Sequence, residues 1–202
     1  VRLLHERDRH DRLREKLLAY DPPMVSKKAA ESYPQRFFRK CTEEGYAKTT
    51  GGNELVAAFS DEWDFLLDSM KIGDLTGLWR PELKGGNWQR IRTSSSSWSN
   101  QGLYYFKGQA WYRQSVGIPA KSRGRRLMLW FGGVDETAQG WVNGKEAGTA
   151  TGAFKPFEFD VTDAAVPGQN NVVVVRIENE ALNELGTGGS VEPVMFYAPA
   201  EK

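Results

Sequence analysis

Histidine and cysteine, the side chains that most often serve as bases, nucleophiles or metal ligands, are sparse in this sequence. His5 and His10 are its two histidines, and five residues place them about 140° apart on a helix, unlike the i, i+4 pair of a zinc site. Cys41 is the single cysteine, so an internal disulfide and a cysteine-cluster metal site are excluded. We interpret the histidines as surface residues and Cys41 as a small buried apolar residue.

Carboxylates are abundant, but they show no catalytic spacing. A glycosidase needs two carboxyl groups that face each other at about 5 to 9.5 Å. No recognisable pair exists among the acidic residues of the second part of the chain, which include Asp61, Glu62, Asp64, Asp135, Glu136, Glu184 and Glu192. The Gly186–Ser190 segment lacks the lysine and the following helix of a phosphate-binding loop. A free-standing glycosidase is therefore the least favoured function.

Aromatic side chains are the most suggestive feature of the sequence. A sugar ring stacks its apolar C–H face on an indole, while its hydroxyls need amide or carboxylate partners. Trp79, Trp98 and Tyr104 lie in a stretch rich in Gly, Ser and Asn, and Asn183 and Glu184 lie on a later loop. We predict that these five residues form a carbohydrate site centred on Trp98. The alternative is that the aromatic residues cover the open end of a buried core.

Length and charge exclude several classes of partner. The chain has 202 residues, and 27 basic against 26 acidic residues leave a formal net charge of +1. Such a balance gives little attraction to nucleic acid or to an anionic membrane surface. No apolar run approaches the roughly 18 residues of a membrane span, and the N-terminus lacks the apolar stretch of a signal peptide. We expect neither a nucleic acid nor a membrane as partner.

The composition changes near residue 60 and divides the chain into two parts. All seven tryptophans follow that point. In residues 1–60, a stripe of leucines (Leu3, Leu4, Leu13, Leu17 and Leu18) predicts an amphipathic helix that ends at Asp21–Pro22. A second helix is expected from about Ser32 to a stop near Gly45. We predict a helical segment over 1–60 and a separate β domain over 61–202.

The second part has the pattern of an antiparallel sandwich. Asn143–Gly144 supplies the two positive-φ residues of a type I′ hairpin turn. Phe157, Phe159 and Val161 alternate with acidic residues, which indicates a strand with one buried face. Leu127–Phe131 is apolar throughout and is expected to be a central strand covered on both sides. The fold class is therefore mostly β: an antiparallel jelly-roll β-sandwich of about eight or nine strands, preceded by a short α-helical region.

Residues 61 to 198 resemble the galactose-binding-like jelly-roll domain, the sugar-binding domain of family 2 and related glycoside hydrolases. The segments that carry the resemblance are Gly108–Arg113 with Ile118–Pro119, Leu129–Asp135, Trp141–Lys145 with Gly148, Pro156–Thr162, and Asn170–Val175. Two features depart from the family pattern. Gly140 replaces a bulkier strand residue, and Thr149–Thr151 replaces a segment that often contains histidine.

The resemblance implies a noncatalytic accessory module, whose partners would be a carbohydrate and the catalytic domain of the same parent protein. Because helices precede the sandwich and Ala198–Pro199–Ala200 is typical of a terminus, we expect a C-terminal module, with residues 1–60 as the end of a preceding domain or a docking linker. The family resemblance further implies an extracellular or periplasmic location. We expect no cofactor, and a structural calcium, which this fold often holds, is left open. A purely structural protein-interaction domain is the main alternative.

Overall fold

The computed structural model describes residues 35–83, 85–93, 98–103, 106–152, 155–180 and 189–200. These residues form α2 (Gln35–Thr50), β1 (Glu54–Ala58), β2 (Glu62–Asp68), α3 (Gly73–Thr76), β3 (Gln89–Arg92), η1 (Ser99–Gln101), β4 (Gly108–Gly117), η2 (Ala120–Ser122), β5 (Met128–Val134), β6 (Thr137–Val142), β7 (Lys145–Thr151), β8 (Phe157–Asp160), β9 (Asn170–Asn179) and β10 (Ser190–Ala198). The predicted fold class, a mostly β sandwich with a helix before it, is confirmed.

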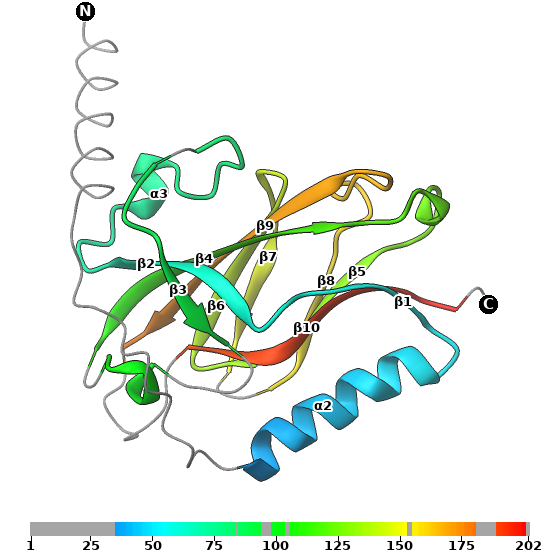
Figure 1. Ribbon diagram of the computed structural model, residues 1–202, viewed down its shortest axis with the longest axis horizontal. Coiled ribbons are helices and arrows are strands. Elements are labelled where there is room, and N and C mark those ends of the chain that lie inside the picture. The colour runs from blue at the N-terminus through cyan, green and yellow to red at the C-terminus, as the bar shows by residue number, and fades with distance from the viewer. Residues whose placement is uncertain are drawn as a thin grey trace, which may run out of the picture.

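The strands form two antiparallel sheets packed face to face, with α2 on the outer side of one of them (Figure 1). The four-stranded sheet has the order β1-β10-β5-β8, and the six-stranded sheet has the order β3-β2-β4-β9-β6-β7. β1 pairs with β10, so that Leu55 lies opposite Tyr197. The sandwich therefore begins at Glu54, before the composition change at residue 60, and it has one or two strands more than expected.

The Asn143–Gly144 turn joins β6 and β7 as predicted. Asn143 and Gly144 both have positive φ, at 51° and 80°. The Asn143 amide also holds the turn against the rest of the domain, because its Nδ2 donates to Asn171 Oδ1 at 2.7 Å and its Oδ1 accepts from the Val172 backbone at 2.9 Å. One asparagine thus closes the hairpin and fixes it to β9.

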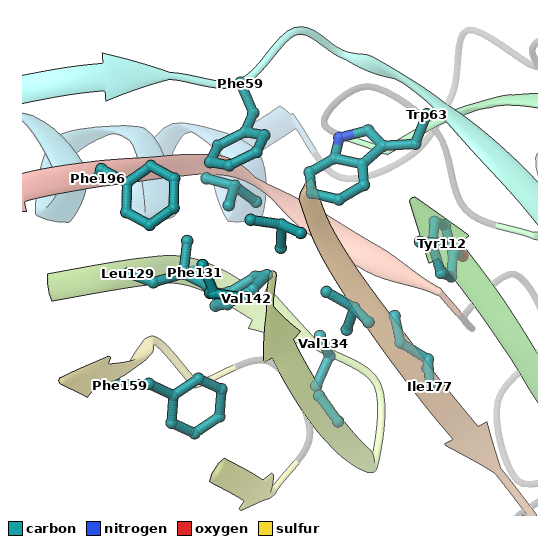
Figure 2. Packing of buried hydrophobic residues seen from close by; sticks show 14 of the residues in the cluster. Phe59, Trp63, Tyr112, Leu129, Phe131, Val134, Val142, Phe159, Ile177 and Phe196 are labelled. Atoms are coloured by element: carbon teal, nitrogen blue, oxygen red, sulfur yellow. The ribbon is translucent and has the colours of Figure 1, made fainter. Parts of the chain in front are cut away.

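The main core lies between the two sheets, where aromatic rings from both of them interdigitate (Figure 2). Phe159 of β8 is the ring that explains the unusual Gly140. A Cβ built on Gly140 would lie 3.2 Å from the Phe159 ring, and one built on the paired Gly148 would lie 2.8 Å from it. The two glycines leave a slot for this ring. The bulkier residue of the family pattern is absent here because Phe159 occupies its place.

A second apolar cluster covers the outer face of the six-stranded sheet. Trp111 and Trp141 stack there with ring centroids 5.4 Å apart. The buried carboxylate of Asp68 joins the start of α3 to this cluster. It accepts hydrogen bonds from the Ile72 and Gly73 backbones at 3.0 and 2.7 Å and from Trp111 Nε1 at 3.0 Å. Asp68 therefore has a structural role at the start of α3.

α2 packs on the outer face of the four-stranded sheet, over a third cluster of Met128, Trp130, Met195 and Tyr197. The expected helix stop near Gly45 is wrong, because the helix continues through Gly45 to Thr50. Gly45 is instead the point of closest approach, since a Cβ there would lie 2.8 Å from Pro193 and 3.1 Å from Trp130. The predicted leucine helix of residues 1–21 lies outside the described residues.

Candidate functional site

Trp98, the predicted centre of the carbohydrate site, lies inside the sandwich. Its side chain is only 2% exposed. The ring packs edge-on against Phe106 at 5.3 Å and Phe65 at 6.3 Å, and its Nε1 donates a hydrogen bond to the Tyr112 hydroxyl. Gly189 closes the remaining side, because a Cβ there would lie 3.0 Å from the indole. The expected exposed platform at Trp98 is therefore wrong: the residue plugs one end of the core and offers no ring face to a sugar.

Trp79 is the predicted platform that keeps part of its ring accessible. It is half-buried against the second cluster, on the chain segment that follows α3. The Arg80 guanidinium lies over its ring at 5.2 Å, and a Cβ built on Gly144 would lie 4.0 Å from it. Trp88 is also half-buried nearby in the same cluster, with Arg113 over its ring at 4.5 Å. Arginine and packing partners thus engage both indoles.

Tyr104, Asn183 and Glu184 lie outside the described residues. Of the two predicted residues that the structure describes, Trp98 lies in the main core and Trp79 packs against the second cluster, so these two do not share a site.

The candidate carboxylates are held in separate local contacts. Asp61 pairs with Arg92 at 2.8 Å, Asp64 with Arg90 at 2.8 Å, and Asp135 accepts from Asn179 Nδ2 at 2.8 Å. Within the part of the chain that the structure describes, no group of three or more His, Cys, Asp or Glu side chains is placed to hold a metal ion. These contacts give Asp61, Asp64 and Asp135 structural partners.

A groove lies between the C-terminal half of α2 and strand β8, and we call it the α2–β8 groove. Its volume is about 670 Å³, within the range of small-ligand sites. The helix side and the strand side both contribute polar and apolar groups. The lining residues are Glu44, Ala47, Lys48, Gly51, Asn53, Trp130, Pro156, Phe157 and Glu158.

An ion pair connects the two sides of this groove. Lys48 Nζ of α2 lies 3.1 Å from Glu158 Oε2 of β8, and the same oxygen accepts a hydrogen bond from the Tyr197 hydroxyl at 2.9 Å. Burial, followed by the neighbouring Glu158 carboxylate, raises the pKa of Tyr197 to about 12. Tyr197 therefore stays protonated at neutral pH and continues to donate to Glu158.

Little in the sequence pattern indicates this groove. Its residues come from three separate segments, and only the packing of α2 on the sheet brings them together. The signal that could have found it is Gly45, because a glycine inside a helical pattern often marks a close approach to another element. The prediction of a helix end at this glycine misses that role.

The β-sandwich is similar to the sugar-binding domain of family 2 glycosyl hydrolases. Residues 98–183 match the model of the family described as "Glycosyl hydrolases family 2, sugar binding domain". This match confirms the resemblance stated from the sequence, and it covers β4 to β9 with the hairpin and the Phe159 slot.

The chain is similar to several curated glycosidases. It is 32% identical to a β-glucuronidase of Paenibacillus borealis over 54% of this chain and 21% of that protein. It is 27% identical to a β-galactosidase of Thermoanaerobacter pseudethanolicus over 46% of this chain and 14% of that protein. The chain thus spans about a fifth or less of the length of these two relatives.

Solved structures show the same fold. The β-glucuronidase of Ruminococcus gnavus aligns with a TM-score of 0.60 at 25% identity, over 73% of this chain and 29% of that one. Among the described residues, neither helix combines the length and the apolar character needed to cross a membrane.

Proposed function

We propose that this chain is a noncatalytic carbohydrate-binding accessory module of a larger glycosidase, in which the catalytic groups reside elsewhere in the parent protein. The observation that carries the proposal is the match of residues 98–183 to the family 2 sugar-binding domain, on a sandwich in which Asp61 and Asp64 are tied into local ion pairs. The relatives named as β-glucuronidases and β-galactosidases suggest a β-glycoside as the parent protein's substrate.

A specific observation favours a second candidate, a purely structural interaction domain. Trp98 is buried, and Trp79 is packed against the second cluster with Arg80 over its ring. A domain of this kind would orient the catalytic domain without touching sugar. The two functions differ in one property, the binding of a soluble glycan by the isolated chain.

Two assays on the purified chain test the proposal. Incubation with p-nitrophenyl β-glucuronide and p-nitrophenyl β-galactoside should release no nitrophenol above a buffer control. Electrophoresis through native gels that contain a soluble β-glucan or galactan should retard the chain relative to a nonbinding protein of similar size. Turnover that a carboxylate substitution abolishes would contradict the noncatalytic role, and unchanged migration in every gel would favour the structural alternative.

A further inference from the structure

The α2–β8 groove carries an inference that deepens the proposed function and rests on it. Its strand side, β8, lies within the residues matched to the family model, whereas its helix side lies before them. The family match therefore does not assign this groove. What it could bind has to be read from its own side chains.

Three polar side chains of the groove, Asn53, Glu158 and Lys48, are held by one or two contacts and keep further hydrogen-bonding capacity. Asn53 Oδ1 accepts from the Ala200 backbone at 3.0 Å, which leaves its Nδ2 as a donor. Both described contacts of Glu158 use Oε2, which leaves Oε1 as an acceptor. Lys48 is positioned by Glu158 and by the Tyr197 ring 5.8 Å away, and an ammonium group has three N–H donors. The groove thus presents fixed donors and a fixed acceptor.

These groups surround an apolar surface. The side chains of Pro156, Phe157 and Ala47 contribute carbon to the lining, and the backbone at Gly51 adds no side chain to it. A pyranose combines hydroxyls, which both donate and accept, with an apolar C–H face. The volume of about 670 Å³ accommodates one or two sugar rings.

The charge of the groove selects between kinds of sugar. Glu44 and Glu158 carry two negative charges and Lys48 one positive charge, so the lining has a net charge of −1. The net negative charge would repel a sugar that has its own carboxylate, whereas it would not repel a neutral sugar. At a separation of about 6 Å in an exposed groove, one like-charge repulsion weakens binding about threefold.

We propose that the α2–β8 groove is a binding site for a neutral hexopyranose unit of a glycan and that it disfavours uronic acids. The isolated chain binds methyl β-D-glucopyranoside there through Lys48, Asn53 and Glu158. It binds methyl β-D-glucuronide about threefold more weakly, because the two ligands differ only in the carboxylate.

Heteronuclear NMR of the 15N-labelled chain tests this site with methyl β-D-glucopyranoside and methyl β-D-glucuronide. The backbone amides of Gly51, Asn53 and Glu158 should shift in a saturable manner with the neutral ligand. In Glu158→Gln, which keeps the side-chain size and removes the charge, neutral binding should weaken and the preference over the glucuronide should disappear. Glu146→Gln makes the same change on β7 of the other sheet, and it should alter neither.

Each contrary result has a distinct meaning. Shifts at Trp79 and Arg80 with an unchanged groove would overturn the groove site and leave carbohydrate binding in place. No shifts anywhere with either ligand at about 50 mM would also overturn the groove site. The gel assay would then decide the proposed function by itself. An unchanged preference in Glu158→Gln would overturn the charge argument.

Discussion

The replacement of Trp98 by alanine separates a core residue from a sugar platform. The indole is 2% exposed and touches Phe65, Phe106 and Gly189, and its Nε1 is hydrogen-bonded to Tyr112. Truncation of a buried tryptophan typically lowers the free energy of unfolding by about 3 to 5 kcal/mol. For a domain of this size, the melting temperature should fall on the order of 10 °C.

Trp79→Ala is the matched control, because it removes the same side chain from a half-buried position. It should lower the free energy of unfolding by only about 1 to 2 kcal/mol, since part of the ring is already in water. Urea denaturation followed by circular dichroism gives both values. The reasoning is refuted if Trp98→Ala unfolds within about 0.5 kcal/mol of the wild type and loses glycan binding, because a surface platform would behave in that way.

Four further changes test particular contacts. Gly45→Val should destabilise the domain by about 1 to 3 kcal/mol in thermal melts, because its Cβ would clash with Pro193 and Trp130, whereas Ala47→Val on the exposed side of α2 should cost only about 0.5 kcal/mol. Gly148→Ala should cost about 1 to 3 kcal/mol in urea denaturation, because its Cβ would lie 2.8 Å from Phe159 at a φ of 150°, and a stability equal to the wild type would show that the slot is not tight. Asp68→Ala should cost about 3 kcal/mol by the same measurement, because it leaves the Ile72, Gly73 and Trp111 donors without their acceptor, and a loss below 1 kcal/mol would mean that water replaces it. The pKa of Tyr197, raised from 10.0 to about 12, predicts a contribution to stability that is complete below pH 10 and is lost between pH 10 and 12; this loss should be absent in Tyr197→Phe when the two proteins are melted across that range.

The fold could be read from the sequence because its signals are local. Asn143–Gly144 determines a hairpin by backbone conformation alone, and the apolar run of β5 indicates a strand covered on both faces. Both predictions are confirmed. The start of the sandwich is harder to predict from the sequence, because β1 is short and is recognised as a strand only through its pairing with β10.

The site was harder to predict because exposure depends on tertiary packing. Trp98 lies beside a polar segment of Ser and Asn, yet its ring turns inward to meet Phe65 of β2 and Phe106. Glycine is a residue type that often ends a helix, but the role of Gly45 depends on Pro193 and Trp130, which lie far away in the sequence. Contacts between such distant segments leave no local pattern, and the α2–β8 groove is built from them.

The most direct test of carbohydrate binding in the α2–β8 groove is calorimetric titration of the unmodified chain with methyl β-D-glucopyranoside, with sorbitol as the matched polyol. A ligand of this size that gains about 0.3 kcal/mol per heavy atom binds with a Kd of about 1 mM. The account predicts a saturable heat near that concentration for the glucoside and none for sorbitol. Equal, nonsaturating heats for both compounds, from a chain shown to be folded by its melt, would contradict it.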